Sequence, residues 1–176
     1  MPESQQVDEP AEMPAVTDLA IVDDPRMQVR LGEIGLIGFA PYLLNRVAGR
    51  YDTVLRGRLA AYGLTMPKIR TLAVLSVIER PLIRDLAIYT VTEQSTLSRA
   101  LDGLVAEGLV RRNQDAQDSR GVRICLTEKG REAFETLWPE MARIYAAMFN
   151  GIPEEESRAL VITLQKLLAN IEALSD

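Results

Sequence analysis

The apolar residues of this sequence change their spacing once, and that change limits the folds open to the chain. From Leu36 to Val105 they recur every three or four positions, as on the buried face of amphipathic helices. Residues 109–112 and 122–126 then show the short apolar patterns of strands, and helical spacing returns from Phe134 onward. The sequence therefore predicts a mainly α-helical fold with one small β-hairpin.

Helix start and stop signals divide the helical part of the chain. Gly63 ends a long first helix, and Thr65 caps a second one. Pro81 separates the second helix from a short third helix of about one or two turns. Residues 90–94 supply caps for a fourth helix, which ends at Gly108 because glycine suits the left-handed position that follows a helix.

Three short helices followed by a hairpin are the order of a winged helix-turn-helix. In this device the last of the three helices enters the major groove of DNA, whose width of about 12 Å admits a helix, while the hairpin reaches the backbone or the minor groove. The hairpin predicted here has a long polar tip at 113–121, and two further helices begin after Thr127 and at Pro153. The predicted fold is thus a winged helix-turn-helix flanked by N- and C-terminal helices.

The predicted fourth helix carries polar side chains in its first two turns, the part that faces bases in such a device. Glutamine can pair with adenine and arginine with guanine, whereas hydroxyl groups bind bases or phosphates. A plain solvated surface also needs a polar face, so this pattern alone leaves both interpretations open. The predicted DNA-reading residues are Gln94, Ser95, Thr96, Ser98 and Arg99.

Several segments resemble the multiple antibiotic resistance regulators, the MarR family. Residues 95–99 and 101–112 are similar to the recognition helix and first wing strand of that family, and residues 61–65 to the junction of its first two helices. The stretch Asp118–Gly130 closely matches its wing motif, which is the most specific part of the resemblance. The resemblance covers nearly everything from residue 36 onward and implies a dimeric winged-helix DNA-binding protein.

The wing tip carries a second set of predicted DNA contacts. Arg120, beside a glycine, can enter a narrow minor groove, where the negative potential is enhanced, and Asp118 can direct its guanidinium. The alternative is a local surface ion pair worth less than about 1 kcal/mol. Arg123 lies on the opposite side of its strand from Val122 and Ile124, and it is the predicted phosphate contact.

The terminal helices carry more apolar surface than a small winged domain could cover. In the resembled family such helices from two chains interlock, which places the two recognition helices about one helical turn of DNA apart. Large side chains such as Trp138 fit either this interface or the core of one chain. The predicted division is a disordered acidic tail at 1–25, a dimerisation helix at 26–62, a DNA-binding lobe at 63–127 and C-terminal dimerisation helices at 128–176.

Members of the resembled family commonly bind small aromatic or phenolic carboxylates. Tyr42, Arg46 and Arg50 follow one another at helical spacing on the predicted first helix, and an arginine beside apolar surface can hold a carboxylate bidentately. The alternative is a helix face that supports the lobe or contacts phosphates. No cofactor is expected, since the chain has no histidine to bind a metal, and an all-carboxylate metal site is the alternative. Cys125 is interpreted as structural because it lies between apolar neighbours in a strand.

The formal charge of −5 hides an uneven distribution. Residues 1–25 hold seven acidic and no basic residues, residues 26–131 hold seventeen basic and ten acidic ones, and residues 132–176 hold three basic and eight acidic ones. The centre of the chain is therefore the part suited to phosphate. No apolar run reaches the roughly 18 residues that span a bilayer, so a cytoplasmic protein without membrane contact is expected.

These observations predict a homodimeric, sequence-specific transcriptional regulator. The expected function is that of a repressor bound to a pseudopalindromic operator in double-stranded DNA and released by a small aromatic or phenolic carboxylate effector. The alternative is a winged protein-interaction module without direct DNA contact, which the acidic ends of the chain suggest. An enzyme is not expected, because without histidine or a glycine-rich phosphate loop no nucleophile and base can be assembled.

Overall fold

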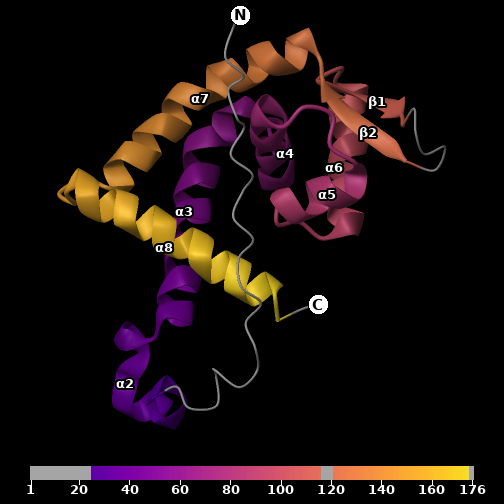
Figure 1. Ribbon diagram of the computed structural model, residues 1–176. Coiled ribbons are helices and arrows are strands. Elements are labelled where there is room, and N and C mark those ends of the chain that lie inside the picture. Colours follow the sequence, from indigo (N-terminus) through magenta and orange to yellow (C-terminus); the bar gives the residue numbers. More distant parts are fainter. Residues whose placement is uncertain (1–24, 116–120, 175–176) are drawn as a thin grey trace, which may run out of the picture. The chain divides into compact units, whose positions relative to one another are not determined.

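The computed structural model describes residues 25–115 and 121–174 (Figure 1). The predicted acidic tail, apart from Pro25, and the wing-tip residues Asp118 and Arg120 lie outside these ranges. Residues 43–150 form one compact unit, and the other described residues form a second unit.

The described chain is mainly helical and contains one two-stranded hairpin, as the sequence predicts. Two short 3-10 turns, η1 and η2, precede α2 and follow α3. In chain order the elements are η1 Pro25–Gln28, α2 Leu31–Gly38, α3 Ala40–Leu59, η2 Ala60–Tyr62, α4 Met66–Val77, α5 Ile83–Tyr89, α6 Gln94–Ala106, β1 Val110–Gln114, β2 Val122–Leu126, α7 Glu128–Met148 and α8 Glu154–Glu172.

Helices α4, α5 and α6 contact one another and the hairpin, and together they form the lobe that carries the predicted DNA contacts (Figure 1). Leu72, Leu86 and Leu97, one from each helix, are fully buried in a shared core. Leu59 of α3 and Leu137 of α7 belong to the same core. The apolar face of each short helix therefore holds it in place, while the other face stays open.

Local signals begin and end several helices where the sequence predicts. Gly63 and Gly108 have φ angles of 67° and 71°, in the left-handed region that favours glycine, and they follow η2 and α6. Thr127 caps α7, since its Oγ1 accepts a hydrogen bond from the Gly130 N–H at 3.0 Å. Pro153 is the N-cap residue of α8.

The hairpin is antiparallel, with Val110 opposite Leu126 and Asn113 opposite Arg123. Strand β2 also contacts α4 and α5, so Ile124 and Cys125 are both buried although they point to opposite sides of the strand. The Ile124 N–H donates to the Pro81 carbonyl oxygen at 3.0 Å. This bond fixes strand β2 to the segment that precedes α5.

One local prediction is wrong, and a second is confirmed only in part. The predicted continuous first helix is interrupted at Phe39, whose extended backbone separates α2 from α3. Glycines at positions 35 and 38 lower the helical propensity just before this break. The N-cap residue of α6, Glu93, lies within the predicted segment 90–94, but its side chain makes no capping hydrogen bond, and Thr92 Oγ1 donates to the Thr90 carbonyl oxygen at 3.0 Å.

Candidate nucleic-acid interface

Helix α6 separates its apolar and polar residues onto opposite faces. Leu97, Leu101 and Leu104 are each 0% exposed and hold the helix on the core of the lobe. The predicted DNA-reading side chains are all exposed, and they occupy the N-terminal half of the same helix. These residues are Gln94, Ser95, Thr96, Ser98 and Arg99. The core thus fixes the direction of the helix, while its polar end is open to a partner.

An ion pair connects this exposed face to the wing. Arg112 of β1 donates through Nη2 to Asp102 Oδ1 of α6 at 2.8 Å. Both side chains are substantially exposed, so the pair adds little to folding stability. The pair joins β1 to α6, two elements that also pack against each other. Sequence reasoning missed this pair, since the partners are brought together only by the fold.

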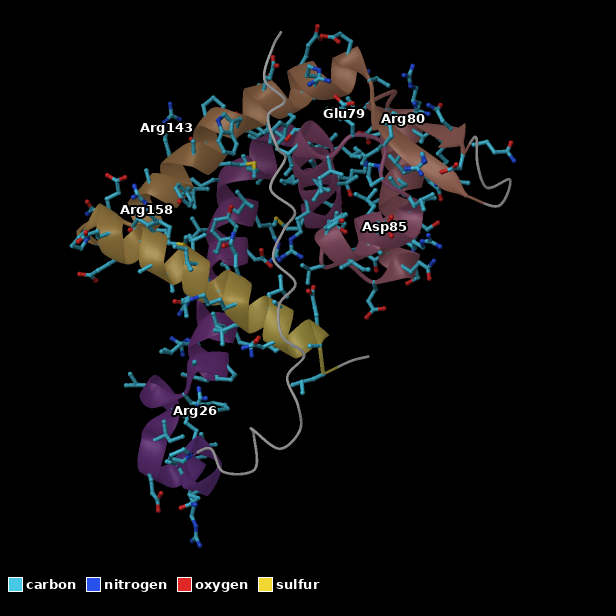
Figure 2. All side chains as sticks on the ribbon, viewed as in Figure 1. Arg26, Glu79, Arg80, Asp85, Arg143 and Arg158 are labelled. Atoms are coloured by element: carbon cyan, nitrogen blue, oxygen red, sulfur yellow. The ribbon has the colours of Figure 1, made fainter. Side chains whose placement is uncertain are left out.

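Arg123 holds the end of the hairpin that lies next to the wing loop. Its Nε donates to the Asp115 carboxylate, and its Nη1 donates to the Arg80 carbonyl oxygen at 2.8 Å. The Asp115 side chain is 5% exposed. The backbone N–H of Asp115 donates to the Gly121 carbonyl oxygen at 2.8 Å, and this bond joins the two ends of the wing loop. Figure 2 shows Arg80 beside the wing. The phosphate contact predicted for Arg123 stays a prediction, and the observed contacts are structural.

The Arg123 ion pair gives a prediction about stability. Arg123→Ala is expected to lower the free energy of unfolding by about 2 kcal/mol, because it removes the guanidinium that pairs with the buried Asp115 carboxylate. Urea denaturation followed by circular dichroism measures this change. Arg111→Ala, an exposed arginine of β1, is the control and should change stability by less than about 0.5 kcal/mol. Equal effects of the two substitutions would contradict the role given to Arg123.

A further basic side chain lies at the start of α5. Arg84 is 75% exposed, and its Nε is 3.5 Å from Asp85 Oδ1. In helix-turn-helix proteins the helix before the recognition helix crosses the DNA backbone, which makes Arg84 a candidate phosphate contact. Sequence reasoning missed it because a single arginine in a short helix forms no motif.

The residues predicted to bind a ligand lie on one helix. Tyr42, Arg46 and Arg50 are on α3 at four-residue intervals, so they share one face of that helix. Tyr42 is partly buried, and both arginines are exposed. A pocket of about 350 Å³ lies elsewhere and does not include any of the three. Its lining comes from Tyr62, Leu64, Glu107, Leu109, Lys129, Ala133, Thr136 and Leu137.

The described parts of the chain bear on the expectations about metal binding and about the Cys125 thiol. Residues 25–115 and 121–174 contain no group of three or more His, Cys, Asp or Glu side chains able to hold a metal ion. The Cys125 thiol is buried and accepts a hydrogen bond from Asn113 Nδ2 at 3.3 Å, as a structural cysteine does. Among the helices of the same described ranges, none is long and apolar enough to cross a bilayer.

Helix α6 has a buried apolar stripe and an exposed polar end, and an ion pair joins it to the adjacent hairpin. This arrangement is that of a winged helix-turn-helix protein. Comparison with known proteins identifies the family. A sequence model of the MarR family matches residues 62–121. A crystal structure of a MarR family transcriptional regulator from Silicibacter pomeroyi is 51% identical, with a TM-score of 0.76, over 81% of this chain and 97% of that one. The chain therefore belongs to the MarR family of transcriptional regulators.

Two more distant relatives add functional information. The HTH-type transcriptional repressor IacR of Pseudomonas putida is 25% identical over 77% of this chain and 81% of its own. BpsR of Bordetella bronchiseptica, whose DNA binding is regulated by 6-hydroxynicotinic acid, is 26% identical over 72% of this chain and 96% of its own, with a TM-score of 0.64. The predicted fold class and family are confirmed, and these relatives are regulators rather than enzymes.

Proposed function

We propose that this protein is a homodimeric, sequence-specific DNA-binding repressor that acts in the cytoplasm and is released from its operator by a small aromatic or phenolic carboxylate. The exposed polar end of α6, fixed on a fully buried leucine stripe, is the observation that carries the proposal. Its side chains offer the amide, hydroxyl and guanidinium groups that read base edges. Catalysis forms no part of the proposed function.

The two DNA-contacting elements have different roles in this proposal. The N-terminal half of α6 reads bases in the major groove, with Arg99 directed to guanine and Gln94 to adenine. The wing-tip residues Asp118 and Arg120 contact the neighbouring minor groove, where a narrow width strengthens the attraction for arginine. Arg123 acts beside the wing loop, where its bonds to Asp115 and Arg80 hold the ends of the strands.

Arg99→Ala tests the DNA-binding proposal directly. One good bidentate contact between arginine and guanine discriminates by about 1–3 kcal/mol, and a dimer makes the contact twice. The affinity for a pseudopalindromic fragment from upstream of the protein's own gene should therefore fall at least about 30-fold, as measured by fluorescence anisotropy. Arg143→Ala on α7, another exposed arginine outside the proposed interface, is the control and should bind within about twofold of wild type. An affinity of Arg99→Ala equal to that of the control would contradict the assignment.

The homodimer is supported by exposed apolar side chains on α8. Helix α8 contains no buried residue, and neither does α2. On α8 the apolar residues recur at three- and four-residue intervals, so they form one stripe. The stripe consists of Leu160, Leu164, Leu167, Leu168 and Ile171, and Leu174 follows just after the end of the helix. Monomeric proteins rarely leave such a stripe in water, and a second copy of the same chain supplies a matching apolar surface.

The effector class is supported by a relative and by α3. Since BpsR is regulated by 6-hydroxynicotinic acid, an aromatic carboxylate is the ligand class that we assign to this protein. Tyr42 can contact the ring, while Arg46 and Arg50 on the same helix face can hold the carboxylate.

A thermal-shift screen of aromatic carboxylates tests this assignment. A ligand present at about 100 times its Kd should stabilise the native protein by about 2.7 kcal/mol, which raises Tm measurably. Arg46→Ala should abolish most of this rise, whereas the exposed Arg143→Ala should keep it. A hit whose shift survives Arg46→Ala binds elsewhere and would remove these residues from the site.

A further inference from the structure

The turn that leads into the recognition helix holds a valine in an unfavourable conformation. Val91, between α5 and α6, has a φ angle of 48°, in the left-handed region that β-branched residues avoid. Helix-turn-helix turns often place glycine where such an angle is needed. The Val91 side chain is also 81% exposed, so burial of its methyl groups does not compensate for this strain.

Backbone hydrogen bonds determine the path of this turn. The Val91 N–H donates to the Ile88 carbonyl oxygen at 3.0 Å, and the Thr92 N–H donates to that of Ala87 at 3.1 Å. Thr90, which is buried, donates through Oγ1 to the Leu86 carbonyl oxygen at 2.8 Å. Because α6 begins only three residues after Val91, any change in the turn alters the direction in which α6 leaves it.

Arg70 of α4 crosses from this turn to α3. Its Nη1 lies 3.5 Å from the Thr90 carbonyl oxygen and 3.4 Å from that of Val91, two long bonds shared by one donor group. Its Nη2 donates to Asp52 Oδ2 of α3 at 2.5 Å. One guanidinium thus connects a long helix outside the DNA-reading region to the carbonyl groups of the strained turn.

The surroundings of Arg70 are partly closed to solvent. Arg70 and Asp52 are 34% and 28% exposed, so water screens their attraction less than that of a surface pair. The neighbouring Tyr51 phenol has its pKa raised by burial and further by Asp52, while Arg70 lowers it. Asp52 is the carboxylate that orients the guanidinium. Because the guanidinium is planar and has several N–H donors, it can bind Asp52 of α3 and the carbonyl groups of the turn at the same time.

We propose that Arg70 is a positioning residue for DNA recognition, which holds the strained Val91 turn so that α6 meets the major groove in the correct direction, with Asp52 orienting Arg70. This inference rests on the proposed DNA-binding function. It also gives α3 a direct connection to the recognition helix, because Asp52 follows the proposed effector residues Arg46 and Arg50 on that helix. A shift of α3 would reach the turn through one side chain.

The test compares Arg70→Gln with the double variant that also carries Val91→Gly. Arg70→Gln should lower affinity for the upstream pseudopalindromic fragment about tenfold, because the turn relaxes when its carbonyl groups lose their donor. Glycine adopts the left-handed conformation without strain, so the affinity of the double variant for the same fragment should return to within about threefold of the wild-type affinity. In the control double variant, Val77→Gly takes the place of Val91→Gly. Val77 is 79% exposed, but its backbone has the ordinary helical conformation, so glycine at this position should not restore the affinity for DNA.

Loss of positive charge and loss of positioning give different results. If Arg70 acts only through charge, Arg70→Gln weakens binding to unrelated DNA by the same factor, and Val91→Gly cannot restore it. If Arg70 only stabilises the fold, Tm falls and the double variant again fails to recover affinity. Either result overturns the proposal. Recovery of operator affinity by Val91→Gly but not by Val77→Gly supports it.

Hydrogen exchange without DNA separates this inference from the proposed function. The Thr92 amide, bonded to Ala87, should exchange about tenfold faster in Arg70→Gln and at the wild-type rate in Arg143→Gln. An unchanged rate in Arg70→Gln overturns the proposal even if the wild-type protein binds its operator. A wild-type protein that prefers no DNA fragment contradicts the proposed function, while the exchange rates still decide whether Arg70 holds the turn.

Discussion

Gly130→Ala is expected to lower the free energy of unfolding by about 3 kcal/mol or more, with a large fall in Tm. Gly130 is buried in the first turn of α7, where an added Cβ atom would overlap the Leu109 carbonyl oxygen and lie 2.9 Å from Leu126 Cδ1. Real Cβ atoms do not approach other atoms so closely, so α7 would have to move away from the wing. Urea denaturation measures the loss.

The bonds around Gly130 make that movement costly. Thr127 Oγ1 accepts from the Gly130 N–H and is itself 2.8 Å from the Gly108 carbonyl oxygen. Separating α7 from the wing therefore disturbs the Thr127 cap of α7 as well as its contacts with Leu109 and Leu126. Gly57→Ala is the matched control, since a Cβ added to Gly57 of α3 would have no atom within 4 Å, and alanine there should stabilise by up to about 1 kcal/mol. A Gly130→Ala protein as stable as wild type would contradict the observed packing.

Leu168→Glu is expected to dissociate the proposed dimer and to lower operator affinity at least about 100-fold. Leu168 is 59% exposed in one chain and lies within the apolar stripe of α8, where a second copy would bury it against hydrocarbon. A single lobe loses the gain in effective concentration that joining two DNA-binding units provides. Sedimentation should show a mass near 19.6 kDa in place of twice that value.

Lys166→Glu provides the control for this experiment. Lys166 is exposed on the same helix, and no residue of the apolar stripe lies three or four positions from it, so the substitution introduces a glutamate outside the proposed interface. It should leave both the mass and the operator affinity near those of the wild type. A dimer that survives Leu168→Glu would show that α8 does not form the interface.

The secondary structure of the lobe could be predicted because its signals are local. Gly63 and Gly108 follow helices because glycine readily adopts the left-handed conformation found at these positions. Thr127 caps α7 through a hydrogen bond to the third residue of the helix. The leucine stripe of α6 has an unmistakable period and is fully buried as expected. The break at Phe39 could not be predicted, because the helical spacing of apolar residues is the same before and after it.

The contacts that orient the proposed interface could not be predicted, because they join residues far apart in the sequence. Arg123 was expected to face phosphate from its place on the strand, yet its bond to Arg80 spans 43 positions. Arg70 reaches Asp52 and the Val91 turn across 18 and 21 positions. The strain at Val91 was likewise invisible, since the sequence shows only a hydroxyl-rich segment that resembles a helix cap.

The affinity of the wild-type protein for DNA as a function of salt concentration tests the central claim most directly. A pseudopalindromic fragment from upstream of the protein's own gene is compared with unrelated DNA of the same length. The account predicts binding at least about 1,000-fold tighter to the upstream fragment, and a loss of at least about 100-fold in affinity between about 50 and 200 mM salt, as expected when four or more phosphates are neutralised. Equal affinity for both fragments, or an affinity that does not change with salt, would contradict it.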